Sequence, residues 1–269
     1  MKTVVVRLAL VCVSLIVISL MFAGISSAQI DPETCVGMWF LDEGSGKIAK
    51  DSSGNKNDGT LMNAPKWVDG KFGKALEFDG VQDYVDCGNP ESLNITTTIT
   101  VMGWVKPDKA LGLDGWQRFA SRGEYNTGWM IGITNAGKPD LTITNAGGGF
   151  VTMYGKTTLE LGKWYHIAGV VDSDARLVYI FLDGTLDNDP MEHSGEMMNP
   201  NVPTTIGKSG VAHVYDFHGI IDEVAIFNVA LTEDDIKSIM TKGLKSVSAV
   251  SPAGKLASVW STIKAHSLK

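Results

Sequence analysis

Aromatic and polar side chains stand close together in two predicted loops. Trp116, Arg118 and Tyr125 belong to the first, and Tyr215 lies between two histidines in the second. Sugars present apolar C–H faces that stack on aromatic rings, while their hydroxyls hydrogen-bond to polar side chains. These four residues are therefore the candidate carbohydrate site, although Trp116 and Tyr125 would serve equally well to cover edges of a core.

Patterns for covalent or metal-assisted catalysis are missing from the sequence. There is no Gly-x-Ser-x-Gly nucleophile elbow, and the histidines and cysteines lack the spacing of a zinc site. Asp222 and Glu223 are adjacent in a predicted strand, so we expect their side chains on opposite faces. Acids from separate loops can still meet in space, so these observations argue against an enzyme without excluding one.

Short β-branched or aromatic segments, separated by Gly, Asn, Asp and Pro, must position the candidate residues. Many short strands with regular turns and almost no helix predict an all-β sandwich or jelly roll. Trp39, Trp104 and Trp164 are expected in its core. The predicted strands include residues 99–105, 141–144, 164–171, 177–182 and 220–227.

One short helix is expected near the C-terminus. Thr232 and Asp235 form a capping box at its start, and Gly243 suits its end. Residues 244–269 follow as a linker and a short amphipathic tail. The apolar face of this tail would dock on the sandwich or on another molecule, or the tail would fray.

Residues 1–28 have the organisation of a signal peptide. A basic start precedes an almost wholly apolar stretch, and small residues stand before a cleavage point after Ala28. The apolar stretch is short of the roughly 20 residues that a spanning helix prefers, which favours cleavage over a permanent N-terminal anchor. We expect a protein that is secreted, periplasmic or at the cell surface, with no membrane span after cleavage.

The composition narrows the class of protein further. A chain with 44% hydrophobic residues and a formal charge of −7 is not disordered. An acidic balance without a basic cluster argues against a protein that binds nucleic acid.

Two cysteines, Cys35 and Cys87, remain after cleavage. In an exported protein they can form a disulfide, and two buried free thiols are the alternative.

A set of segments between residues 36 and 243 occurs in a characteristic order. Together these segments resemble the laminin-G-like jelly-roll family of the concanavalin A-like lectin/glucanase superfamily. The resemblance implies two antiparallel sheets packed face to face in one domain over residues 30–243. The segments are residues 38–46, 51–55, 58–61, 73–80, 83–85, 99–105, 164–170, 178–184 and 219–227.

The resemblance also implies a metal site, because many relatives have one. Calcium takes hard oxygen ligands from carboxylates and carbonyls. Asp42 and Asp222 would meet because the terminal strands of this fold pair, and Asp79 with Asp83 forms a second candidate loop. The alternative is that these acids cap turns by accepting backbone N–H groups.

The resemblance and the loop aromatics together predict a non-catalytic module that binds a glycan. Some relatives bind protein partners through the same loops, so an adhesion or interaction domain at a cell surface is the alternative. The superfamily also includes glycoside hydrolases, in which two carboxylates flank the scissile bond. The glucanases carry them as Glu-x-Asp-x-(x)-Glu on one strand, and that run is missing from this sequence.

Overall fold

The computed structural model describes residues 30–109, 115–124, 126–210 and 215–248. The chain divides into two units, Met1–Asp31 and Pro32–Lys269, and the elements described below belong to the second. The predicted signal peptide, Tyr125 and the amphipathic tail lie outside the described residues.

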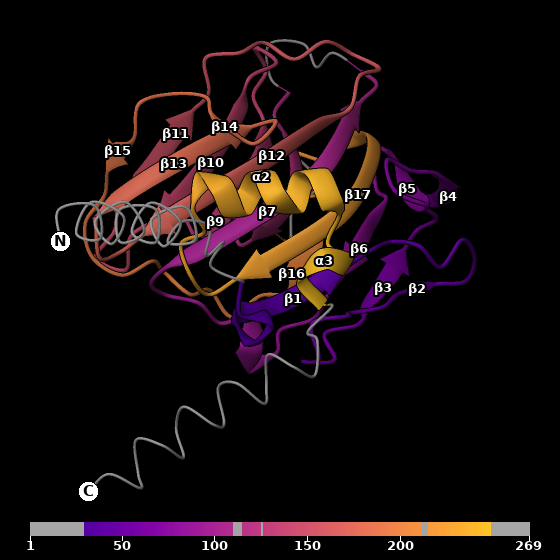
Figure 1. The fold of residues 1–269 in the computed structure, drawn as a ribbon, viewed down its shortest axis with the longest axis horizontal. Coiled ribbons are helices and arrows are strands. Elements are labelled where there is room, and N and C mark those ends of the chain that lie inside the picture. The colour runs from indigo at the N-terminus through magenta and orange to yellow at the C-terminus, as the bar shows by residue number, and fades with distance from the viewer. Residues whose placement is uncertain (1–29, 110–114, 125, 211–214, 249–269) are drawn as a thin grey trace, which may run out of the picture. The chain divides into compact units, whose positions relative to one another are not determined.

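Strands dominate the second unit, and they form two antiparallel sheets (Figure 1). Sheet A has the order β14-β13-β12-β7-β17-β5-β4, with β1 also paired to β17 and β15 to β13. Its strands are β1 (Cys35–Trp39), β4 (Lys66–Asp69), β5 (Lys74–Asp79), β7 (Ile99–Pro107), β12 (Tyr165–Asp172), β13 (Leu177–Leu182), β14 (Thr185–Leu186), β15 (Met191–Glu192) and β17 (His218–Phe227).

Sheet B has the order β11-β10-β9-β8-β16-β6-β3-β2. Its strands are β2 (Ile48–Ala49), β3 (Gly59–Met62), β6 (Tyr84–Asp86), β8 (Gln117–Arg122), β9 (Trp129–Ile133), β10 (Pro139–Thr144), β11 (Phe150–Tyr154) and β16 (Thr204–Ile206). Neighbours in both sheets are often distant in sequence, as in a jelly roll. The predicted two-sheet antiparallel sandwich is confirmed.

The inner faces of the two sheets enclose one apolar core, because apolar residues recur at every second position of the long strands. Ile99 and Val101 of β7 meet Ile131 of β9 and their neighbours in this core. Trp39 belongs to it as expected, whereas Trp104 is buried outside this core cluster. Trp164 is only partly buried, so its assignment to the core was wrong.

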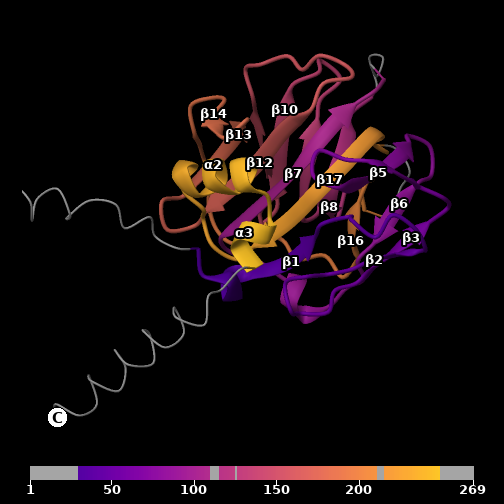
Figure 2. The same cartoon turned by 45° about the vertical axis from the view of Figure 1, so that its right-hand side comes forward.

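The expected helix forms with the predicted cap. α2 (Glu233–Lys242) starts where the Thr232 hydroxyl accepts a bond from the Asp235 backbone N–H, and the Asp235 carboxylate accepts one from the Thr232 N–H. The helix lies against the outer face of sheet A (Figure 1, Figure 2). It is followed directly by α3 (Lys245–Ser248), so packed structure continues beyond Gly243. The short 3-10 helices are η1 (Pro32–Thr34) and η2 (Glu91–Leu93).

No helix in the described ranges has the length and apolar character needed to cross a bilayer.

The Cys35–Cys87 disulfide is not present, and both residues are buried free thiols. Cys87 belongs to the core between the sheets, whereas the Cys35 thiol on β1 is directed to the Gly37 carbonyl at 3.5 Å. Their side chains therefore have different environments. Burial raises the pKa of Cys35 to about 12, which keeps this thiol protonated and unreactive.

A β-bulge in β17 changes the expected orientation of two acids. The pairing of β17 with β7 shifts register between Asp222 and Ala225, and Glu223 has a positive φ of 47°. Ile221 and Val224 both face the core, so Asp222 and Glu223 between them both turn away from it. The expectation of opposite faces was wrong because the bulge interrupts strand alternation.

The two acids join sheet A to neighbouring segments. The Asp222 carboxylate accepts a 2.9 Å bond from the Phe72 backbone N–H, and Glu223 accepts one of 2.7 Å from the Leu244 N–H after α2. Burial raises the pKa of Asp222 to about 7, and the nearby Glu223 carboxylate acts in the same direction. Asp222 is thus a carboxyl group that the folded state holds protonated across the acidic range.

We expect Asp222 to make stability fall as pH rises from about 4 to about 7. The unfolded chain loses this proton near the ordinary aspartate pKa of about 3.9, whereas the folded chain keeps it until about pH 7, so the free energy of unfolding decreases across that window. The variant Asp222→Asn should lack this decrease. Urea unfolding at several pH values should show the free energy of unfolding of the variant rising relative to that of the parent chain. The rise is about 1.4 kcal/mol for each unit by which the pKa of Asp222 is higher in the folded chain than in the unfolded chain.

The exposed Asp174 provides the matched control. Asp174→Asn should follow the pH profile of the parent chain. Parallel profiles for Asp222→Asn and the parent would contradict the assignment.

Candidate functional site

The outer face of sheet B, which is the face turned away from the core, carries a band of buried polar side chains. Phe119 and Ala120 of β8 both face the core, because a bulge separates Arg118 from Ala120 in the pairing with β9. Arg118 and Ser121, three positions apart, therefore both point outward. Other buried side chains also point to the outer face of sheet B. They are Met130, Asp140, Thr142, Thr144, Thr152 and Thr205.

A buried ion pair joins β8 to β10 across this face. The Arg118 Nη1 lies 2.7 Å from both carboxylate oxygens of Asp140, and the two side chains are 1% and 0% exposed. Gly132 of β9 stands opposite both residues, and its missing side chain leaves the path between them open. Burial raises the pKa of Asp140, and Arg118 opposes that increase.

Two aromatic rings contact the Arg118 guanidinium, and a third ring packs against one of them. The Trp116 ring lies 6.0 Å from that of Tyr154 in an edge arrangement and 6.5 Å from that of Tyr215. The guanidinium lies 4.7 Å from the Trp116 ring and 5.8 Å from the Tyr215 ring, within the range of cation–π attraction. Tyr154 is 42% exposed. We call Trp116, Tyr154 and Tyr215 the ring cluster.

The structure thus brings together Trp116, Arg118 and Tyr215 of the four predicted residues, while Tyr125 lies outside the described residues. Arg118 differs from its expected role, because its guanidinium is buried and bound to a carboxylate. Sequence reasoning missed Asp140 and Tyr154. The alternation in residues 141–144 did indicate one polar face, but nothing local showed that this face meets Arg118.

Backbone groups of Gly207, Lys208, Tyr215 and Phe217 make hydrogen bonds in this region, next to β8. The Lys208 carbonyl accepts a 2.9 Å bond from the Ser121 hydroxyl, the Tyr215 carbonyl accepts one of 2.9 Å from the Arg118 backbone N–H, and the Gly207 carbonyl accepts one of 2.8 Å from the Phe217 N–H. These bonds place the backbone of Lys208 beside Ser121 and the backbone of Tyr215 beside Arg118.

The terminal strands pair as expected, since β1 runs antiparallel to β17. This pairing brings Asp42 and Asp222 to one turn, the turn between β4 and β5. Asp42 accepts a 2.8 Å bond from the Lys74 backbone N–H, and Asp222 accepts one from Phe72. The second Asp42 oxygen lies 2.9 Å from the Lys245 ammonium. Both acids thus cap the turn.

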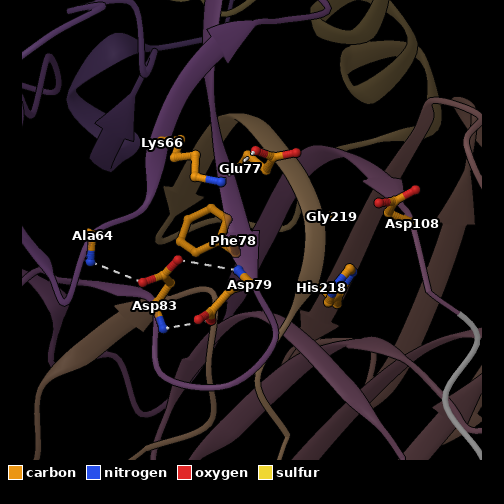
Figure 3. Close-up of a pocket in the computed structure, with 9 residues that line it drawn as sticks. All are labelled: Ala64, Lys66, Glu77, Phe78, Asp79, Asp83, Asp108, His218 and Gly219. Atoms are coloured by element: carbon orange, nitrogen blue, oxygen red, sulfur yellow. Dashed lines mark hydrogen bonds and ion pairs between the residues drawn. The ribbon is translucent and has the colours of Figure 1, made fainter.

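Asp79 and Asp83 line a cavity of about 380 Å³ beside the turn between β5 and β6. Figure 3 shows the Asp83 carboxylate directed at the backbone nitrogens of Ala64 and Asp79, at 3.0 and 3.3 Å. Asp79 in turn accepts backbone N–H bonds from Val81, Gln82 and Asp83. These bonds give both acids a turn-capping role.

The donor set fits calcium poorly in the part of the chain that the structure describes. No group of three or more Asp, Glu, His or Cys side chains there is placed to hold a metal ion. The four candidate acids form two separate pairs, and each carboxylate already accepts backbone N–H bonds. Calcium binding stays a prediction from the resemblance.

Comparisons with solved structures returned binding domains of similar fold. The binding domain of Paraclostridial Mosquitocidal Protein 1 superposes with a TM-score of 0.65 at 16% identity, over 78% of this chain and 52% of that one. The ligand-binding domain of botulinum neurotoxin serotype D, solved with N-acetylneuraminic acid, gives 0.62 at 13%, over 79% and 52%. The chain spans about half the length of these toxin domains.

Domain 4 of AbnA, an extracellular GH43 arabinanase from Geobacillus stearothermophilus, was solved with arabinotriose. It gives a TM-score of 0.59 at 20% identity, over 77% of this chain and 98% of that domain. At such identities the similarity shows the fold. A comparison with curated proteins found no match.

The family comparison covers more than half of the chain. A family model described as the concanavalin A-like lectin/glucanases superfamily matches residues 79–237, which include β7 to β13, the ring cluster, Arg118 and Asp140. Together with the two-sheet sandwich, this match shows that the chain belongs to the concanavalin A-like lectin/glucanases superfamily.

Proposed function

We propose that this chain is an exported, non-catalytic module that binds a glycan on the outer face of sheet B. One observation carries the proposal: on a polar sheet face, two partly exposed rings contact the guanidinium of the buried Arg118–Asp140 pair, and the exposed Tyr154 ring packs against one of them. Rings of this kind can stack on the apolar faces of sugars. The export expectation comes from the signal-like residues 1–28.

Some polar atoms in and near this face are enclosed by protein. Within the described residues, the Arg118 Nε, the Thr144 hydroxyl and the Ser209 hydroxyl are buried and lack a hydrogen-bond partner. An unsatisfied buried polar group costs about 1–3 kcal/mol. A ligand on the surface does not reach these atoms, so the partly exposed rings carry the proposal.

The comparison with AbnA domain 4 supports the same ligand class. The chain matches nearly the whole of that domain. The protein unit that was solved with arabinotriose is therefore similar in extent to the sandwich of this chain. The toxin domains support it less, because the chain matches about half of each. A protein-binding role is the alternative, and the ligand tests below separate the two.

The acid that pairs with Arg118 beside the ring cluster does not suit hydrolysis. Asp140 is fully buried, its carboxylate lies against Arg118, and Thr142 contacts it at 3.5 Å. A glycosidase carboxyl group must reach the scissile bond and work with a second one about 5 Å away or farther. The buried position of Asp140 therefore favours a structural role in a binding site.

We further propose that the fold does not depend on calcium. Thermal unfolding of the chain in millimolar calcium and in chelator, at matched ionic strength, should give the same Tm, because the four candidate acids are engaged in turn capping. A ligand that binds only the folded state would raise the Tm. A calcium-dependent increase would therefore contradict this proposal and make Asp42, Asp79, Asp83 and Asp222 the first residues to substitute.

Removing a ring from the cluster should weaken glycan binding. We expect Trp116→Ala and Tyr154→Ala each to raise the Kd for arabinotriose, or for another saccharide found in a panel, by about tenfold, which corresponds to about 1.4 kcal/mol. Isothermal titration calorimetry measures the change.

Tyr179→Ala is the matched control, because Tyr179 stacks on Phe181 at 6.2 Å on sheet A. It should bind as the parent chain does. Unchanged affinity in both ring-cluster variants, or no saccharide bound by the parent chain, would contradict the proposed site or the proposed function.

A further inference from the structure

Phe150 is a second exposed ring on the strand that carries Tyr154. Within the described residues, the exposed large apolar side chains include two aromatic ones, Phe150 at 44% and Tyr154 at 42%, and both belong to β11. Met153 lies in the core and Val151 packs against it. Because these two residues alternate with the rings, both rings point to the outer face of sheet B. The face of the ring cluster therefore carries a further aromatic surface.

The two rings are separated by one outward position of the strand, which Thr152 occupies. Phe150 and Tyr154 are four residues apart, which is about 13 Å along a strand and exceeds the width of one sugar ring. The Thr152 hydroxyl lies 3.0 Å from that of Thr142 on β10, and both residues are buried. These small side chains form a low floor between two raised rings. We call Phe150, Thr152 and Tyr154 the β11 strip.

A glycine run in the turn before β11 leaves the Phe150 end of this strip open. Gly147, Gly148 and Gly149 belong to the turn between β10 and β11, and a Cβ placed at any of them would meet no other atom within 4 Å. Gly148 and Gly149 have positive φ angles of 87° and 82°, which favour glycine. These glycines do not block a ligand chain that continues past Phe150.

The contacts at the other end of β11 favour a saccharide over a protein strand as the occupant. A partner strand would pair with the backbone of β11, which is an edge strand of sheet B. The Tyr154 carbonyl already accepts a 2.8 Å bond from the Asn188 side-chain amide, and the Lys156 N–H donates to the Asp187 carbonyl at 3.0 Å. Two exposed rings with a low floor between them suit sugars, whose apolar faces stack on aromatic rings.

We propose that Phe150 is a second stacking platform, which makes the outer face of sheet B select saccharide chains longer than a disaccharide. The inference rests on the proposed glycan-binding function. A longer chain stacks one sugar on the ring cluster at Tyr154 and another on Phe150, whereas a disaccharide reaches one of these two rings. The ligand class is therefore an oligosaccharide or polysaccharide chain rather than a single sugar.

Chain length is the variable that tests this selection. Isothermal titration calorimetry on the full chain should show arabinopentaose bound about tenfold more tightly than arabinobiose, or better, because only the longer chain gains the second stacking contact. Where arabinose oligomers do not bind, the disaccharide and pentasaccharide of the class found in the panel replace them.

Substitution of Phe150 should remove the gain from chain length. We expect Phe150→Ala to raise the Kd for the pentasaccharide by about tenfold and to leave the Kd for the disaccharide at the parent value. Phe150→Tyr, which keeps a flat ring, should retain the gain, whereas Phe150→Leu should not. Leu186→Ala is the matched control, since Leu186 is an apolar side chain of similar exposure on β14 of sheet A.

The outcomes separate the inference from the proposed function. A Tm for each variant confirms folding, and Phe150→Leu against Phe150→Tyr makes the same comparison if Phe150→Ala is unfolded. If the parent binds both lengths equally, or Phe150→Ala changes both Kd values by the same factor or neither, the inference is wrong and the glycan-binding function stands. If no saccharide in the panel binds at either length, the proposed function fails and the inference with it.

Discussion

A buried ion pair between Arg118 and Asp140 determines how the outer face of sheet B is arranged. The pair connects β8 and β10 across β9, and it is possible only because Gly132 has no side chain between them; a Cβ at Gly132 would also collide with the Gln117 carbonyl oxygen. Removing one partner of such a pair leaves an uncompensated buried charge, at a cost of about 3–5 kcal/mol. The guanidinium also contacts Trp116 and Tyr215. The ion pair therefore holds in place the guanidinium that two rings of the cluster contact.

The charge balance of the same face follows from this pairing. Because Arg118 is committed to Asp140, it contributes no free positive charge to a ligand. Partly exposed aromatic rings beside a polar sheet face suit a ligand with apolar faces and many hydroxyls. The fold contributes a rigid platform, since the residues concerned stand on strands or are bonded to them.

The sequence predicted most of the scaffold, because scaffold signals are local. Alternation identified the strands around Ile99 and Leu141, and the Thr232–Asp235 box located α2. Two bulges escaped prediction, at Arg118–Ala120 and at Asp222–Ala225, because a bulge depends on the pairing with a partner strand. Asp140 and Tyr154 were missed for the same reason. Asp79 and Asp83 are candidate calcium ligands in the sequence because an Asp that caps a turn and an Asp that binds a metal look alike there.

The most direct test of the account is a titration of ¹⁵N-labelled protein with a neutral oligosaccharide, followed by NMR. The largest shift changes are expected on the Trp116 indole N–H and on backbone amides of β8, β10 and β11. Changes concentrated instead around the cavity at Asp79 and His218, or on sheet A beneath α2, would contradict it.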